Sequence, residues 1–481
     1  MSAEEIGRAV RNNTFRSRGA RARAIAASIA AIALLAVACG GTAEEPAAEE
    51  PAAEEPATEE PVGLDGPVRI GVAADLTGPF TIYGTSMARS AQIAVDEINA
   101  AGGIGGQQVE LIIEDTQTDV TVTVDKARKL IESDGVQMVL GPIGSDANDA
   151  VFQTVVGEYG VLQIYPETYE GGKCDPLFFS TGATPAQQIR PLLDRMQGEY
   201  GPKVLLFGAD YVWPRRSFEV AKPIIEEIGG ELVGEVYLPL VAEDYSELIT
   251  QVRDSQPDYI FTLYPAVWGA ALKALEDAGL LTDELGLGTT FLGDPDLAGI
   301  GALARNNYTA LPFFTVAPGD GVAGFLAAYE ETFGAGEIPS GGESMGSYNA
   351  IHLYKQAVEA VGTTDPATVA EALRGQSFDG PTGTVTMNAS NHLEQTIMLV
   401  KVNDAGVYEF VEAFDARDPE EACSFCRAPR GGGRSRPSSS SRSSPCRCSR
   451  TTRSSSAASG ATSSGRCSRS RSTSSGASGA C

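Results

Sequence analysis

The segment VRIGVAADLTGPFTIYG (68–84) joins a buried strand to a helix. Its first part, VRIGVAAD (68–75), is a β-branched apolar run typical of a strand with both faces covered. Turn residues follow, and apolar positions then recur at helical spacing as far as Ile98, before Gly102 ends the predicted helix. A strand that leads directly into a helix is the first half of a βαβ unit.

The same alternation of strand and helix continues along the chain. In a first series we expect strands at 109–115, 137–141 and 161–165, with helices at 121–134 and 146–158. In a second series we expect strands at 203–208, 231–240, 259–264 and 289–293, with helices at 216–228, 244–254 and 267–278. The alternation predicts an α/β protein with two doubly wound parallel-sheet lobes, and ligands of such sheets bind beyond the carboxyl ends of the strands.

An export signal precedes the first lobe. Residues 24–39, AIAASIAAIALLAVAC, are an apolar run behind four arginines, and they end in small residues before Cys39. The run is too short to span a bilayer, and its flanks are those of a cleaved signal. Residues 1–39 are therefore predicted to be a bacterial lipoprotein signal peptide, with the mature chain beginning at a lipid-modified Cys39.

Two polar segments flank the folded part. Residues 40–65 repeat Glu-Glu-Pro-Ala units and are predicted to be an extended, disordered stalk. Residues 421–481 form an Arg/Ser-rich tail; from 427 on it has eleven arginines, no acid and no large apolar side chain, so it is predicted to be disordered. A shifted reading frame would give this composition, and we favour that origin over an RNA-binding tail.

Charge and cysteine content limit the partners. The chain carries a formal net charge of −27 although the tail is basic, so the folded part is strongly acidic. Such a surface argues against nucleic acid as a partner. Apart from Cys39 and the cysteines of the tail, Cys174 and Cys423 remain for a disulfide in an oxidising compartment.

Four stretches carry a family resemblance. RIGVAADLTGPFTIYGTSMARSAQIAVDEINAAGGIGGQQVELIIEDTQTD (69–119) resembles the opening of branched-chain amino acid binding proteins of ABC importers, the type 1 periplasmic binding proteins. The segments 165–188, 208–240 and 378–411, which include YEGG-x-C and DY-x-WPR, are similar to the urea and short-chain amide binding branch. The resemblance covers about 66–415.

The resemblance implies a clamshell of two lobes joined by a three-strand hinge, with crossovers near 189, near 315 and around 376–390. It divides the chain into lobe 1 (66–188), lobe 2 (189–315), a return to lobe 1 (316–376) and a return to lobe 2 (377–420).

Several candidate ligand contacts come from lobe 1. Ser145 opens a helix after a strand, so its hydroxyl and the first backbone N–H groups are expected to donate to a ligand oxygen, or Ser145 caps the helix. In the amide-binding proteins this turn, here Ile143 and Gly144, holds the ligand, although an aromatic residue usually replaces Ile143. The family places further contacts in the segment that contains Tyr165, Glu167 and Thr168. Glu167 is unusual there, because a neutral amide needs no carboxylate and an ammonium group does.

Aromatic side chains follow the strands of lobe 2 and are expected to enclose a small planar ligand. They are Tyr211 and Trp213 after one strand, and Tyr264 and Trp268 after another. The resemblance adds Tyr83, which matches an aromatic residue of the amino-acid-binding pocket, and Asp294, which lies where that branch keeps an acid for the α-amino group.

Catalysis has little support in the sequence. His352 lies in an apolar helix and His392 in a turn where we expect exposure, and neither belongs to a metal-ligand spacing or a nucleophile elbow. We therefore expect a protein that is not an enzyme and that holds no metal and no cofactor.

The main functional hypothesis is an exported, lipid-anchored protein that captures urea or a short-chain amide and delivers it to the permease of an ABC importer. The first alternative is a branched-chain or aliphatic amino acid binding protein of such an importer. The second is an amide-sensing regulatory protein of the same fold.

Overall fold

The structure is a computed structural model that describes residue 64, residues 66–421 and residue 423. The predicted signal peptide with Cys39, and nearly all of the predicted stalk and tail, lie outside these residues. No helix in the described part of the chain is both long and apolar enough to cross a membrane.

A parallel five-stranded sheet forms the core of the first lobe. Its strand order is β2-β1-β3-β4-β5, and Val72 of β1 pairs with Ile113 of β2 on one side and Leu140 of β3 on the other. The strands are β1 (Val68–Ala74), β2 (Val109–Asp115), β3 (Met138–Leu140), β4 (Leu162–Tyr165) and β5 (Phe178–Ser180). The sequence predicted all of these strands except β5. Strand β5 was missed because it is a three-residue run without flanking periodicity.

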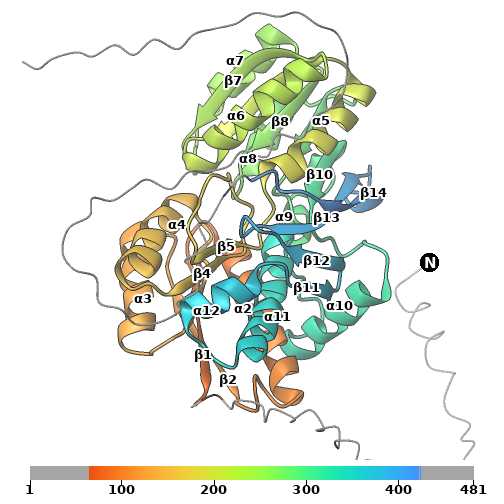
Figure 1. Ribbon diagram of the computed structural model, residues 1–481. Coiled ribbons are helices and arrows are strands. Elements are labelled where there is room, and N and C mark those ends of the chain that lie inside the picture. The colour runs from red at the N-terminus through yellow and green to blue at the C-terminus, as the bar shows by residue number, and fades with distance from the viewer. Residues whose placement is uncertain (1–63, 65, 422, 424–481) are drawn as a thin grey trace, which may run out of the picture. The chain divides into compact units, whose positions relative to one another are not determined.

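Helices from two parts of the chain cover this sheet (Figure 1). The first group connects the strands, and the second returns after the second lobe, where α11 packs along α2. The first group is α2 (Thr81–Ala100), α3 (Val120–Glu132), α4 (Ser145–Phe152) and the π-helical turn Gln153–Glu158. The second is α10 (Asp320–Phe333), α11 (Gly342–Val361) and α12 (Pro366–Leu373).

The second lobe is built on a nine-stranded sheet. Strands β6 to β10 are parallel in the order β10-β9-β8-β6-β7, and antiparallel strands extend the sheet beyond β10. The strands are β6 (Lys203–Ala209), β7 (Glu231–Leu238), β8 (Tyr259–Leu263), β9 (Gly286–Thr289), β10 (Asn307–Leu311), β11 (Ser377–Gly380), β12 (Gly383–Met387), β13 (Leu393–Val402) and β14 (Tyr408–Arg417). The helices are α5 (Pro185–Tyr200), α6 (Val212–Glu227), α7 (Ser246–Ser255), α8 (Trp268–Asp277), α9 (Asp294–Ile300) and the 3-10 turn Gly301–Ala304.

Strand β9 lies three residues earlier than the predicted strand at 289–293. Strand β9 contains two glycines, so it lacks the run of β-branched or apolar residues by which strands are predicted. The structure explains why glycine is needed at these positions. A Cβ on Gly286 would lie 2.5 Å from the Tyr200 ring, and a Cβ on Gly288 would lie 3.3 Å from Met196. Helix α5, which carries both side chains, packs directly on this strand.

A disulfide joins Cys174 to Cys423, with 5.5 Å between the two Cα atoms. It attaches the segment after β14 to the segment between β4 and β5. Glu421 reinforces the attachment, because its Oε2 accepts a hydrogen bond from the Gly172 backbone at 3.1 Å. The cysteine pair left open by the sequence is therefore bonded in the structure.

Replacing Cys423 by serine should lower the free energy of unfolding by about 2 kcal/mol. We expect a value at the lower end of the range for disulfides, because Glu421 and the hydrogen bond from Thr184 to the Pro419 carbonyl also hold this segment. Denaturant unfolding with and without a reductant measures the effect. Reductant should destabilise the wild type and leave Cys423→Ser unchanged, and an equal response of both proteins would contradict the prediction.

Candidate functional site

A small cavity lies between the carboxyl ends of the two sheets. In the first sheet it lies beside β1 and β3, and in the second beside β6 and β8, where the strand order reverses in each sheet. Loops diverge at such a switch point and leave a crevice. The lining residues are Phe80, Tyr83, Ile143, Gly144, Ser145, Glu167, Thr168, Tyr211, Trp213, Pro265, Phe291, Leu311 and Glu343.

The first-lobe wall follows β1 and β3. Phe80 and Tyr83 stand at the start of α2, and the turn at 143–145 leads from β3 into α4. The Ser145 hydroxyl donates to Oε2 of the buried Glu170 at 2.7 Å. A hydroxyl has one proton to give, so the Ser145 oxygen faces the cavity as an acceptor and not as the donor predicted from the sequence.

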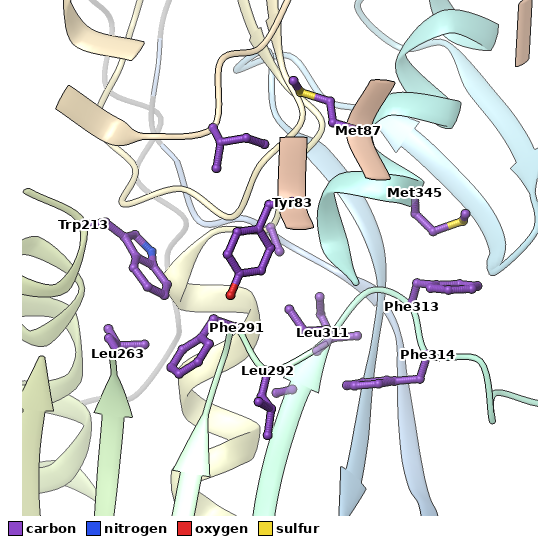
Figure 2. Close-up of a cluster of buried hydrophobic side chains, with 14 of the residues drawn as sticks. Tyr83, Met87, Trp213, Leu263, Phe291, Leu292, Leu311, Phe313, Phe314 and Met345 are labelled. Carbon is purple, nitrogen blue, oxygen red and sulfur yellow. The ribbon is translucent and has the colours of Figure 1, made fainter. Parts of the chain in front are cut away.

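The second-lobe wall is mostly aromatic. Tyr211 and Trp213 follow β6, Pro265 follows β8, and Phe291 follows β9. The Phe80 ring meets Tyr211 from across the cavity at 6.3 Å between centroids, and Trp213 meets Phe291 edge-on at 6.4 Å. Figure 2 shows Trp213, Phe291 and Tyr83 turned toward one another at the strand ends.

Two carboxyl groups line the cavity, and each has one oxygen without a hydrogen-bond partner. Glu167 follows β4, and its Oε1 accepts a hydrogen bond from the Thr168 backbone at 2.8 Å, while its buried Oε2 has no hydrogen-bond partner. Glu343 stands in the first turn of α11 with 3 % exposure, and its Oε1 also has no partner. Burial raises the pKa of Glu167 well above its usual range, and the nearby Glu343 raises it further. Burial also raises the pKa of Glu343 to about 8.

A third acid lies behind Tyr83 and connects the lobes. The Tyr83 hydroxyl, on α2, donates to Oδ1 of Asp296, on α9, at 3.0 Å. Burial raises the pKa of Asp296 to about 7, against the lowering effect of hydrogen bonds from the Gly293 backbone and from Tyr83. The Tyr83 hydroxyl proton is therefore also committed to a carboxyl group.

Eight of the twelve predicted ligand-contact residues line the cavity. They are Tyr83, Ile143, Gly144, Ser145, Glu167, Thr168, Tyr211 and Trp213. The other four, Tyr165, Tyr264, Trp268 and Asp294, lie outside its lining, each for an identifiable reason.

The three aromatic residues outside the lining are packed in the lobes. Tyr165 belongs to β4, and its hydroxyl donates to the Ile143 carbonyl behind the cavity wall. The Tyr264 hydroxyl donates to the Pro239 carbonyl at 2.6 Å, so this ring turns into its own lobe. Trp268 is 2 % exposed and packs against Phe207 in the core.

Asp294 turns away from the cavity at the start of α9. Its carboxyl group accepts hydrogen bonds from the backbone and the hydroxyl of Thr315. Asp296, one half-turn further along α9, approaches the cavity instead, through Tyr83.

Five lining residues were not predicted: Phe80, Pro265, Phe291, Leu311 and Glu343. Phe80 carries a signal that the sequence did show, since it is aromatic and follows a predicted strand. Phe291 lies inside the predicted strand at 289–293, and it follows a strand only because β9 ends at Thr289. Glu343 has no such signal. It begins a helix of the returning segment, and only the packing of α11 against the first lobe brings it to the cavity.

The histidines do not form a reactive group. His392 is fully buried, not exposed as predicted, and its ring stacks on Tyr169 with 5.7 Å between centroids. Burial lowers its pKa to about 4. The His352 ring stacks on Phe378 at 4.5 Å. Within the described residues, no group of three or more His, Cys, Asp or Glu is arranged to hold a metal ion.

Comparisons with known proteins place this geometry among solute receptors. The model of a family described as periplasmic binding protein matches residues 67–407. A leucine-, isoleucine-, valine-, threonine- and alanine-binding protein of Pseudomonas aeruginosa is 28% identical over 348 residues, covering 68% of this chain and 87% of the relative. A Leu/Ile/Val-binding protein homolog of Brucella melitensis is 27% identical over 337 residues, which covers 68% and 88% of the two chains.

Solved structures share the fold at lower sequence identity. A solute-binding protein of an ABC transporter from Rhodopseudomonas palustris, in complex with 3,4-dihydroxybenzoic acid, has a TM-score of 0.66 at 22% identity. The match covers 73% of this chain and 98% of that one. A branched-chain amino acid transporter substrate-binding protein of Streptococcus pneumoniae, in complex with isoleucine, has a TM-score of 0.62 at 24% identity, covering 72% and 98%.

Proposed function

This chain belongs to the periplasmic binding protein family, and from that membership we propose that it is the solute-binding protein of an ABC importer for a small solute with a positively charged amino group, such as an amino acid. The ligand contacts that we propose are the eight predicted residues of the cavity lining together with Glu343. The solute is held between the lobes and passed to a membrane permease.

One observation carries the proposal: the cavity offers unpartnered carboxylate oxygens and no cation. Glu167 Oε2 and Glu343 Oε1 lack partners, and the described residues that line the cavity include no Lys, Arg or His. A buried carboxyl group without a cation is costly unless it is protonated. A ligand with an ammonium group supplies the missing charge.

The same observation ranks the alternatives. Aromatic acids such as the 3,4-dihydroxybenzoic acid of one structural neighbour would bring a carboxylate into an acidic cavity, where like charges repel. Urea and short-chain amides are neutral, so they supply no counter-charge when the two carboxyl groups ionise. The named relatives bind amino acids, which favours the amino acid alternative over the amide hypothesis.

Donors for an α-carboxylate are also at hand. The first backbone N–H groups of α4 open beside Ser145, and this helix end favours a negative group. The hydroxyls of Thr168 and Tyr211 line the same cavity. We also propose that the protein is exported and lipid-anchored at Cys39, and this part of the proposal rests on the sequence alone.

Amino acids should stabilise the protein against heat, while the corresponding N-acetyl amino acids should not. A solute at ten times its dissociation constant adds about 1.4 kcal/mol of apparent stability. A thermal-shift panel of leucine, lysine, arginine, urea, acetamide and benzoate tests this. Removal of the ammonium charge by acetylation is the matched control. Stabilisation by urea or acetamide, with none by any amino acid, would overturn the proposal.

A further inference from the structure

The cavity has a second carboxyl group, that of Glu343. One carboxylate is enough to balance the charge of one ammonium group, so the second needs its own explanation. It lies on α11, a helix of the segment that returns to the first lobe, whereas Glu167 follows β4. Both groups face the same cavity, and each has one oxygen without a hydrogen-bond partner.

Backbone packing holds these two acids side by side. The start of α11 presses on the segment that carries Glu167, so closely that a Cβ on Gly346 would lie 2.2 Å from the Pro166 carbonyl oxygen. A Cβ on Gly342 would lie 3.4 Å from the Thr168 hydroxyl. Asp296 acts on both acids and Asp75 acts on Glu167, and both of these neighbours are acidic. The pair is therefore an acidic site, and the described residues that line it include no Lys, Arg or His.

The neighbouring hydroxyls add acceptors to this site. The Tyr83 hydroxyl donates its hydrogen bond to Asp296, and the Ser145 hydroxyl donates its hydrogen bond to Glu170. Toward the cavity these two oxygens can only accept. A ligand group that fits here is rich in N–H donors and has no acceptor of its own.

Flat aromatic walls enclose the same space. Tyr211 meets Trp213 at 6.4 Å between centroids, and Phe80 meets Tyr211 at 6.3 Å. Aromatic faces attract cations, and a planar cation stacks on them with the largest contact.

We propose that the Glu167–Glu343 pair binds a guanidinium group, with the planar cation lying against the aromatic wall. This inference rests on the proposed function, because it takes the cavity to be the solute site. Guanidinium presents N–H donors along several edges in one plane, so it can serve two carboxylates at once. Ammonium is a point charge, and urea has the same flat shape without the charge.

Calorimetric titration of the full chain at pH 8 tests the proposal. L-Arginine and agmatine, which separate an amino acid source of the guanidinium group from a simpler one, are compared with L-lysine, L-leucine and urea. We expect at least one guanidino compound to bind ten or more times more tightly than lysine, leucine and urea. Glu343→Gln should weaken that binding about a hundredfold, and Glu226→Gln, on the exposed face of α6, should not change it.

Proton release on binding provides a second measurement. If Glu343 had only a structural role, its replacement would not change the number of protons released. Titrations in phosphate and in Tris should differ in heat because guanidinium binding expels a proton from the carboxyl pair, and Glu343→Gln should reduce that difference. This comparison remains informative if the variant is less stable.

The outcomes separate the two proposals. Equal binding of leucine and arginine, unaffected by Glu343→Gln, would overturn the guanidinium site and leave amino acid capture intact. Lysine bound as tightly as arginine would also overturn it, because the pair would then recognise charge and not the planar group. Tight binding of agmatine alone would support the guanidinium site and count against an amino acid ligand. Binding of urea alone would overturn both.

Discussion

Raising the pH from 6.5 to 9 should lower the free energy of unfolding of the ligand-free protein by about 3 kcal/mol through Glu343 and Asp296, and further through Glu167. The pKa of Glu343 is raised to about 8, that of Asp296 to about 7, and that of Glu167 well above its usual range, in each case chiefly by burial. A carboxyl group with a raised pKa stabilises the fold fully below its unfolded-state pKa. That stabilisation is lost as the pH rises through the folded-state pKa, because the native protein must then give up protons that the unfolded chain has already lost.

Urea denaturation at half-unit pH steps measures this slope. Glu343→Gln removes one titrating group, so its slope should be shallower, and at pH 9 the variant should be more stable than the wild type. Glu226→Gln should keep the wild-type slope. His392, with a pKa lowered to about 4, titrates below this window. Stability that is constant or rises with pH in the wild type would refute the buried acid cluster.

Replacing Gly346 by alanine should destabilise the protein by about 3 kcal/mol and weaken solute binding. Alanine normally stabilises a helix interior by up to about 1 kcal/mol over glycine. Here the new Cβ would lie 2.2 Å from the Pro166 carbonyl oxygen, which belongs to the backbone and cannot rotate away. Helix α11 or the segment at 166–168 must shift, which costs packing energy and moves Glu343 relative to Glu167.

Gly324→Ala is the matched control for this substitution. Gly324 is also inside a helix, α10, and a Cβ there would meet nothing within 4 Å. This variant should gain about 0.5 to 1 kcal/mol and bind solute as the wild type does. If Gly346→Ala were as stable as Gly324→Ala, α11 would not press on the 166–168 segment as the structure indicates.

The acidic cavity links these predictions to function. Unpartnered carboxyl groups reduce the stability of the ligand-free protein once they ionise, and a bound cation supplies the missing charge. Solute should therefore stabilise the protein more at pH 8.5 than at pH 6.5.

Most of the fold could be predicted from local patterns. The β-branched run at β1 and the helical periodicity after it identify the first βαβ unit, and strands β2 to β4 and β6 to β8 follow the same rule. The failures have local causes as well. Strand β9 is glycine-rich because α5 packs on it, and β5 is too short to show a period.

The binding residues divide in the same way. Residues that directly follow strands, such as Ser145 and Tyr211, could be placed near the cavity because the carboxyl ends of parallel strands meet at one edge. Tyr83, inside α2, was placed there by the family resemblance. Which way a side chain turns could not be predicted. Tyr264 and Trp268 follow a strand too, yet they pack inside their own lobe.

The sequence by itself determined the α/β class, the two series of strands and the edge of each sheet where a ligand binds, because all three depend on periodicity and chain order. Tertiary structure alone decided the chemistry of the cavity. Glu343 lies near Glu167, 176 residues earlier in the sequence, only because α11 returns to the first lobe. The hydroxyls of Ser145 and Tyr83 donate hydrogen bonds to Glu170 and Asp296, which also lie far from them in the sequence. Such pairings depend on contacts between distant segments, which no local pattern records.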